Sequence, residues 1–249
     1  MPIARSTPTR TNPCLRSCVC RIAAVASLIA AAAPAPAALG VEAPPPRADF
    51  GRAAASQDTH RLADWIVAGA DNVRQPFFIV DKRQARLYAF DAAGHLKGDA
   101  PVLLGLARGD ETVPGIGERK LADIKPHERT TPAGRFIGEP GPNAHGDTVV
   151  WVDYDAAVSM HRVITSNPKE RRLQRLATRT VADNRISYGC INVPAAFYDA
   201  MVLPVFQKAD AVIYVMPDTR SLSATFGKLA AQVAAGGRPG PVRPEPASP

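Results

Sequence analysis

The middle of this sequence is divided into short apolar or alternating runs, which clusters of Gly, Pro, Asn and Asp separate. The runs lie at residues 77–80, 87–90, 100–109, 133–141, 148–154, 156–163 and 210–217. Such runs are typical of β-strands, and the polar turn at residues 81–84 predicts a hairpin between the first two. So many short strands within roughly 140 residues predict a mainly β fold, a sandwich or a barrel.

Helices are expected only at the periphery of these strands. Residues 56–73 place apolar side chains at helical spacing. Residues 194–207 predict a second helix, and the basic segment 167–185 predicts a helical insertion. Residues 109–131 have no regular pattern, and a loop of that length is usually functional or mobile.

The N-terminal segment has the composition of an export signal. Residues 1–21 contain four arginines and no acidic residue, and residues 22–33 are apolar but too short to span a bilayer. Ala35 and Ala37 have the spacing that a signal peptidase recognises. Residues 1–37 therefore predict a Sec-type signal peptide and a periplasmic or cell-envelope location, with an uncleaved membrane anchor as the alternative.

The remaining chain divides into three parts. Residues 38–75 predict a linker followed by a short helix, and residues 76–216 predict one β-rich domain. Residues 217–249 predict a short helix and a disordered tail rich in Pro and Gly.

Net charge limits the class of partner. Removal of residues 1–37 lowers the formal net charge from +7 to +3, so the alkaline pI belongs partly to the signal. Nucleic acid is therefore not an expected partner. A mildly basic exported protein suits an anionic polymer of the cell envelope.

Cysteine usage singles out one residue. Three of the four cysteines precede the expected cleavage site, so Cys190 would be the only one left and could form no intramolecular disulfide. An unpaired thiol in an oxidising compartment requires an explanation: a packed thiol, a metal ligand or a nucleophile. A zinc site is disfavoured because there is no second cysteine and no pair of histidines at ligand spacing, so we expect no metal.

The residues around Cys190 suit acyl transfer. A nucleophilic cysteine needs a base, and His161 ends an apolar run, whereas the other histidines lie in a predicted helix, a turn or polar loops. Gly189 permits close approach of the backbone to a substrate. The further candidates are the amides of Tyr188, Gly189 and Cys190 as an oxyanion hole, Ser187 as a hydrogen-bonding partner within the turn or for the base, and Asn192 as a group that orients a substrate amide or carboxylate. Taken alone, this pattern leaves a buried, inert cysteine equally open.

Four segments in order resemble one enzyme family. "FFIVDKRQARLYAF" at residues 77–90, "TTPAGRF" at 130–136, "AVSMH" at 157–161 and "SYGCIN" at 187–192 resemble the L,D-transpeptidase (YkuD-type) catalytic domain. Any one of these matches would be unspecific. The resemblance covers residues 76–216.

The resemblance implies a β-rich catalytic domain of the bacterial cell wall. Cys190 would attack the L,D amide of a peptidoglycan tetrapeptide stem, with His161 as the base and the amides of Tyr188, Gly189 and Cys190 as the oxyanion hole. An amine of a second stem, or of another acceptor such as a lipoprotein, would resolve the acyl-enzyme. The resemblance also implies reactivity with carbapenems and no metal or organic cofactor.

The sequence departs from the family's pattern at three points. Tyr188 stands where a second histidine is usual, and Arg162 follows the base where Gly or Ser is usual, which would reorient the imidazole or add an anion contact. The separation of 29 residues between His161 and Cys190 is longer than usual, because of the basic segment 167–185. That segment is either a solvated helical face or a lid that contacts the anionic stem peptide.

Other functions remain open. An L,D-carboxypeptidase would use the same residues but transfer the acyl group to water, and a wall-binding protein could keep the fold without activity. A sortase-like transpeptidase would also pair an exported Cys with a His. It would need an arginine on a later strand, and residues 210–217 contain none.

Overall fold

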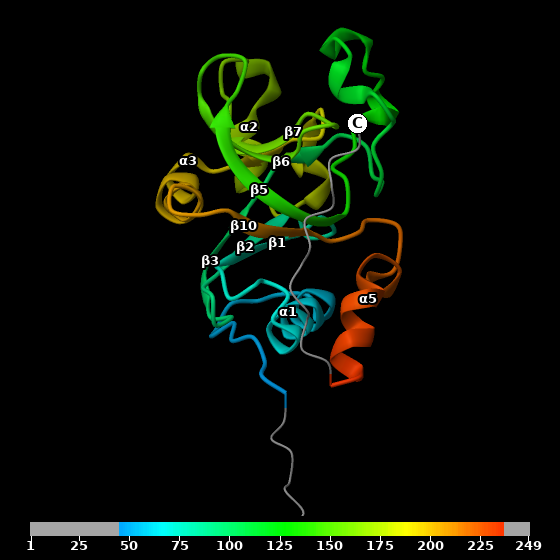
Figure 1. The fold of residues 1–249 in the computed structure, drawn as a ribbon. Helices are drawn as coiled ribbons and strands as arrows, with labels where there is room; N and C mark the ends of the chain where they lie inside the picture. Colours follow the sequence, from blue (N-terminus) through cyan, green and yellow to red (C-terminus); the bar gives the residue numbers. More distant parts are fainter. Residues whose placement is uncertain (1–44, 237–249) are drawn as a thin grey trace, which may run out of the picture. The chain divides into compact units, whose positions relative to one another are not determined.

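The computed structural model describes residues 45–236, so the predicted signal peptide and most of the predicted tail lie outside the described residues. The described chain is mainly β, as predicted (Figure 1). One sheet has eight strands in the order β3-β2-β1-β10-β5-β6-β7-β9, and a second sheet pairs β4 with β8. The strands are β1 (Phe77–Asp81), β2 (Arg86–Phe90), β3 (Leu96–Pro101), β4 (Leu104–Gly105), β5 (Gly134–Pro142), β6 (Thr148–Asp153), β7 (Val158–Arg162), β8 (Arg185–Ser187), β9 (Ile191–Val193) and β10 (Ala211–Val215).

The large sheet nearly closes on itself. Leu103 lies just after the edge strand β3, and it exchanges two backbone hydrogen bonds with Asn192 of β9, at the other edge, of 2.9 and 2.8 Å. Pairing of the two edges removes unsatisfied backbone groups that an open sheet would expose. It also brings the segment that contains Cys190 next to the end of β3.

Alternation of side chains along the central strands produces two cores. In β1, Phe78 and Val80 point into a cluster enclosed by the curved sheet and the segment 195–206, and the ring of Phe78 stacks on Phe206 at 5.4 Å. Phe77 and Ile79 point the opposite way, into a second cluster. Because successive side chains of a strand face opposite sides, a strand buried on both faces is apolar throughout.

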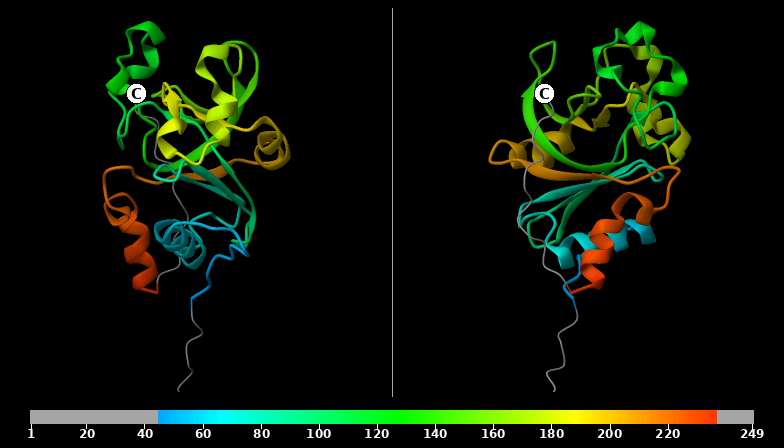
Figure 2. Two further views of the ribbon diagram at one scale, coloured as in Figure 1. Left: turned by 180° about the vertical axis from the view of Figure 1, so that it is seen from behind. Right: turned by 45° about the vertical axis from the view of Figure 1, so that its right-hand side comes forward.

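Two helices cover the second core. Helices α1 (Gln57–Gly69) and α5 (Leu222–Ala234) lie side by side on the outer face of β1, β2 and β10 (Figure 2). The hydroxyl of Ser56 caps α1 by accepting a bond of 3.1 Å from the Thr59 amide. The helix ends at Gly69, earlier than Pro76 would have required, because Ala70 adopts a left-handed conformation with φ 50°.

Three segments differ in detail from the sequence-based expectation. Residues 167–185 do not form one helix: they contain a 3-10 turn (Pro168–Glu170), the short helix α2 (Arg172–Ala177) and another turn (Val181–Asn184), with Arg171 at φ 50° between the first two. Of the predicted strand at 100–109, the first two residues end β3 and Leu104–Gly105 form β4. The predicted helix at 194–207 consists of α3 (Ala195–Phe197), a π turn (Tyr198–Val202) and α4 (Leu203–Phe206).

The long loop at residues 109–131 contains three 3-10 turns: Ile116–Glu118, Leu121–Asp123 and Pro126–Glu128. In Figure 1 it lies above the central strands β1, β2 and β10, as α2 does, whereas α1 and α5 lie below them. Among residues 45–236, no helix is long and apolar enough to cross a membrane.

Candidate active site

Cys190 and His161 meet where two parallel strands lie side by side. β7 pairs with β9 in a register that places Met160 opposite Ile191 and His161 opposite Asn192. Met160 and Ile191 are buried in the core. Alternation therefore directs His161 and Asn192 to the other face of these strands, together with Cys190, the residue just before β9.

The sulfur of Cys190 is surrounded by polar groups of the neighbouring strand. The backbone amide of Ser159 points at Sγ from 3.5 Å, and the Ser159 hydroxyl lies at 3.7 Å. The backbone carbonyl of Ala157 lies at 3.7 Å from Sγ. Cys190 remains partly exposed, so the thiol is held by the protein and is still open to solvent.

The pKa of the Cys190 thiol lies below its ordinary value. Burial by itself raises that pKa, but the neighbouring His161 ring, which is charged once it takes up the thiol proton, and the hydrogen bonds from Ser159 outweigh the effect of burial. Because the thiolate is the nucleophile, a lowered pKa makes this cysteine more reactive near neutral pH.

The orientation of the His161 ring is fixed by the next residue. Nδ1 lies 2.7 Å from the carbonyl oxygen of Arg162. A carbonyl oxygen only accepts hydrogen bonds, so Nδ1 must carry a proton. In the neutral ring Nε2 then keeps its lone pair, which is the form that can accept a proton from a thiol.

Ser187 and Gly189 shape the turn before Cys190. The Ser187 hydroxyl donates to the Cys190 carbonyl at 2.6 Å and accepts from the Gly189 amide at 3.1 Å. Gly189 has φ 137°, and a Cβ at this position would approach the Thr130 carbonyl oxygen to 2.8 Å. Only glycine fits this conformation and this contact.

The backbone amides of this turn differ in availability. The sequence predicted that the Gly189 amide would bind an oxyanion. That amide instead donates to the Ser187 hydroxyl, so it is not free. The amides of Tyr188 and Cys190 donate to no other group of residues 45–236. These two are therefore the donors that a developing oxyanion next to Sγ could use.

Arg162 does not join this site. Because it alternates with His161 along β7, its side chain turns to the other side and forms an ion pair with Asp199 at 2.6 Å. Its guanidinium also lies over the ring of Tyr198, 4.8 Å from the centroid. Of the two expected effects of Arg162, the anion contact is made with Asp199 and not at Cys190, whereas the Arg162 carbonyl does orient the imidazole of His161.

Tyr188 contacts the long loop instead of the catalytic pair. The residue is 37% exposed, and the guanidinium of Arg129 stacks over its ring at 3.9 Å from the centroid. Two nitrogens of Arg129 donate to the carbonyl of Ile124, at 3.2 and 3.0 Å. Tyr188 is thus a platform on which the end of the loop at residues 109–131 rests.

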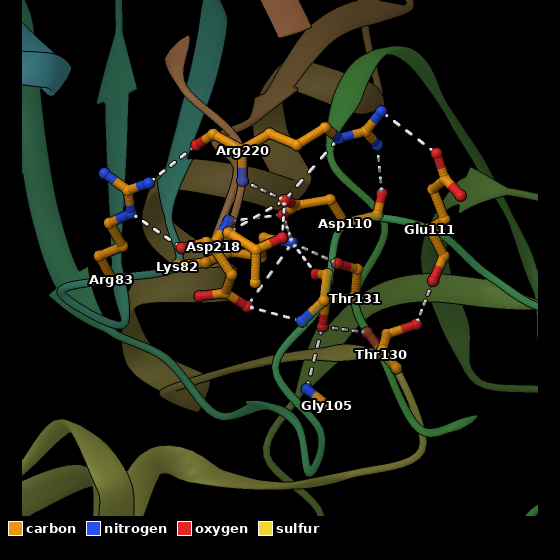
Figure 3. Close-up of polar contacts among 12 residues, drawn as sticks. Lys82, Arg83, Gly105, Asp110, Glu111, Thr130, Thr131, Asp218 and Arg220 are labelled. Atoms are coloured by element: carbon orange, nitrogen blue, oxygen red, sulfur yellow. Dashed lines mark hydrogen bonds and ion pairs between the residues drawn. The ribbon is translucent and has the colours of Figure 1, made fainter. Parts of the chain in front are cut away.

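A buried ionic cluster, which the sequence analysis missed, holds the loop next to the site (Figure 3). The ammonium group of Lys82 is fully buried and donates to the carbonyls of Gly109 and Thr131, at 2.6 and 2.7 Å, and to Asp110 at 3.1 Å. Burial lowers the pKa of Lys82, although Asp218 and Asp110 oppose the effect.

Two acids balance two bases in this cluster. Asp218 forms an ion pair with Arg185 at 2.6 Å. Asp110 accepts hydrogen bonds from Thr219 and from the amides of Asp218 and Arg220. Such a cluster stabilises a fold only while every partner is present, because an unpaired buried charge is costly.

Thr131 connects the ionic cluster to the catalytic turn. Its carbonyl accepts from Lys82, and its hydroxyl donates to the Gly189 carbonyl at 2.7 Å. The segment "TTPAGRF" was singled out in the sequence only through the resemblance, and this contact gives it a physical role. Among the described residues, no group of His, Cys, Asp and Glu has the arrangement of a metal site.

Comparisons with known proteins give only distant similarities. No family model matches the sequence, and no curated protein is significantly similar to it. Among solved structures, an L,D-transpeptidase from Mycobacterium smegmatis is 14% identical over 57% of this chain and 58% of its own, with a TM-score of 0.33. The helical cell shape determining protein Pgp2 from Campylobacter jejuni is 15% identical over 59% of this chain and 49% of its own, with a TM-score of 0.37.

The catalytic domain of the E. faecium L,D-transpeptidase is 15% identical over 57% of this chain and 98% of its own, with a TM-score of 0.32. The matched part of the chain thus spans little more than half of the mycobacterial protein and about half of Pgp2. Scores this low carry no conclusion about function, which rests on the geometry of the site.

Proposed function

We propose that this protein is an exported cysteine L,D-transpeptidase that acts on peptidoglycan tetrapeptide stems. The observation that carries the proposal is the meeting of Cys190, whose pKa is lowered, with His161, whose Nε2 can accept a proton, on neighbouring strands. The sequence resemblance supplies the substrate class.

In the acylation step, His161 takes the thiol proton and Sγ of Cys190 attacks the carbonyl carbon of the L,D amide. The amides of Tyr188 and Cys190 stabilise the negative oxygen of the tetrahedral intermediate. The C–N bond then breaks, D-alanine leaves as an amine with the proton from His161, and the tripeptide acyl group remains as a thioester.

In the transfer step, an amine of a second stem attacks the thioester carbonyl while His161 accepts its proton. The C–S bond breaks, and the proton returns to the Cys190 thiolate. The product is a 3-3 cross-link, or a conjugate with another amine such as a lipoprotein lysine. Water in place of the amine would make the same site an L,D-carboxypeptidase.

Labelling with a carbapenem tests whether Cys190 is a nucleophile. We expect intact-mass spectrometry to detect one covalent adduct, mapped to Cys190 after digestion, and none in Cys190→Ala. A correctly folded protein with a free thiol and no adduct would contradict the proposal and favour a wall-binding role.

Incubation with tetrapeptide muropeptides tests the reaction. We expect cross-linked dimers, free D-alanine and few tripeptides. Exclusive release of tripeptides would identify a carboxypeptidase instead. For the proposed export, cell fractionation and N-terminal sequencing are expected to find a periplasmic protein that begins after Ala37.

A further inference from the structure

One arginine of the basic insertion reaches into the candidate active site. Arg172 is the first residue of α2, and its side chain is only 12% exposed. Nη1 donates to Oδ1 of Asn192 at 2.5 Å, and Nε donates to the carboxylate of Glu170 at 2.5 Å. The insertion is therefore neither a solvated face nor a free lid at this position.

The contact with Arg172 determines which way the Asn192 amide faces. A guanidinium only donates hydrogen bonds, so the oxygen of the amide must point toward it. Asn192 is fully buried, so its amide has only these protein partners and no solvent to satisfy it in another orientation. Its nitrogen Nδ2 consequently points to the opposite side, where it lies 3.5 Å from Nε2 of His161 and 3.3 Å from the carbonyl of Cys190.

The direction of this amide affects the protonation of His161. A donor facing Nε2 opposes a proton on that nitrogen and so favours the neutral ring. At 3.5 Å the contact is long, and the thiol of Cys190 takes its place when Nε2 accepts the proton. A reversed amide would present Oδ1 to Nε2 and favour the protonated ring, which cannot act as a base toward Cys190. Of the other charged groups nearby, Glu170 is paired with Arg172 and Arg162 with Asp199. Asp147 lines the same pocket as His161, and its carboxylate accepts a hydrogen bond from Asn143.

We propose that Arg172 is a positioning residue, which holds the donor side of the Asn192 amide toward His161 and thereby keeps the imidazole in its proton-accepting form. This inference rests on the proposed function, since it assigns His161 the role of the base. It gives the insertion at residues 167–185 a part in the reaction without any contact between Arg172 and the substrate.

The test follows the titration of the His161 ring by NMR in the full chain, in a Cys190→Ser background. Serine removes the coupling between thiol and imidazole, so one group titrates by itself. Arg172→Met keeps the aliphatic stem of the side chain and removes its donors. We expect the midpoint of the His161 titration to rise by about one pH unit, a tenfold change in the protonation equilibrium.

Three further variants separate orientation from charge and from stability. Arg179→Ala removes the same charge from an exposed residue of the same insertion, and no shift is expected. Arg172→Lys can still donate to Oδ1, so its titration midpoint is expected to lie between those of the parent protein and Arg172→Met. In an Asn192→Ala background, Arg172→Met should no longer shift the midpoint. Thermal unfolding of each variant verifies that the fold is retained.

Two results would overturn the inference: an unchanged midpoint in folded Arg172→Met, or an equal shift with and without Asn192. The measurement needs no peptidoglycan substrate, so its outcome is independent of the carbapenem and muropeptide experiments. A shift without carbapenem labelling would reject the proposed function and keep the link between Arg172 and His161. Carbapenem labelling without a shift would keep the proposed function and reject the link between Arg172 and His161.

Discussion

Thr131 donates a hydrogen bond of 2.7 Å from its hydroxyl to the carbonyl oxygen of Gly189, 58 residues further along the chain. The same hydroxyl accepts a bond of 2.9 Å from the amide of Gly105 in β4. Thr131 is fully buried. One hydroxyl thus joins the small sheet to the turn that precedes the candidate nucleophile.

Replacement of Thr131 by valine is expected to lower both stability and acylation. Valine has the same shape but leaves the Gly105 amide and the Gly189 carbonyl without this partner, at a cost of about 2 kcal/mol in the free energy of unfolding. Thr131→Ser keeps the hydroxyl and is the control. Urea unfolding and the rate of carbapenem acylation measure the effects, and equal values for the two variants would contradict the role of the hydroxyl.

Gly189→Ala is expected to impair the site more severely. The added Cβ would meet the Thr130 carbonyl at 2.8 Å, and φ 137° is a conformation that alanine rarely adopts. Displacement of the turn would move Sγ of Cys190 away from its productive position, which we expect to slow acylation roughly 100-fold. Gly227→Ala is the control, because a Cβ there meets nothing within 4 Å. Normal acylation by Gly189→Ala would argue against a restricted turn.

The sequence predicted most strands because their side chains alternate or are uniformly apolar between turn-forming residues. β3 was missed since its residues, "LKGDAP", form a partly exposed edge strand with little apolar pattern. β8 and β9 were missed because each has three residues and exists only through parallel pairing across a sequence separation, β8 with β4 and β9 with β7. Local patterns do not contain that information.

The sequence predicted the reactive residues of the candidate site but not the buried charged residues that hold them in place. His161 ends a predicted strand, and Cys190 was singled out by cysteine usage and by the resemblance, whereas the strand β9 that follows it was not predicted. Lys82 and Arg172 are charged, and sequence reasoning assigns such residues to the surface. Their burial depends on partners that are distant in sequence: Lys82 lies 49 residues from Thr131, and Arg172 lies 20 residues from Asn192.

Tyr188 is expected to act through its ring as a platform and through its backbone amide. Tyr188→Phe keeps the stacking with Arg129 and should acylate normally. Tyr188→Ala should lose about 0.5–1 kcal/mol of loop stabilisation, the contribution of an exposed cation–π contact, and acylate more slowly. Tyr188→His, the residue that the resemblance led us to expect, should retain activity. The measurement is the rate of acylation. A much faster rate in Tyr188→His than in the parent protein would instead indicate that a histidine side chain has a function here that tyrosine lacks.

The pH dependence of Cys190 alkylation is expected to report the influence of His161. Burial raises the pKa of the thiol, whereas the neighbouring His161 ring lowers it. His161→Gln therefore raises the midpoint of iodoacetamide labelling, by about one to three pH units. Ser159→Ala removes a weaker contribution and keeps the backbone amide, so its shift should be smaller. A midpoint that is unchanged in His161→Gln would show that His161 does not influence the pKa of the Cys190 thiol.

Asp110 is expected to make the fold sensitive to acid. Burial raises the pKa of this carboxyl, but hydrogen bonds from Thr219 and from the amides of Arg220 and Asp218 lower it further, to a value well below the ordinary one. The unfolded chain takes up a proton near the ordinary pKa of about 3.9, while the folded protein still excludes it. Stability from this group is therefore fully present above that pH and is lost as the pH falls toward the lowered value.

Asp110→Asn removes this contribution, because an amide cannot be protonated in that range and accepts fewer of the four hydrogen bonds from residues 218–220. We expect a lower free energy of unfolding at pH 7 and a shallower decline between about pH 5 and pH 2 than in the parent protein. Glu111→Gln is the matched control, since its carboxylate is 80% exposed and pairs only with the exposed guanidinium of Arg220 at the rim of the cluster. Urea titrations across this pH range measure the slope, and parallel declines for the parent and Asp110→Asn would assign the acid sensitivity to other groups.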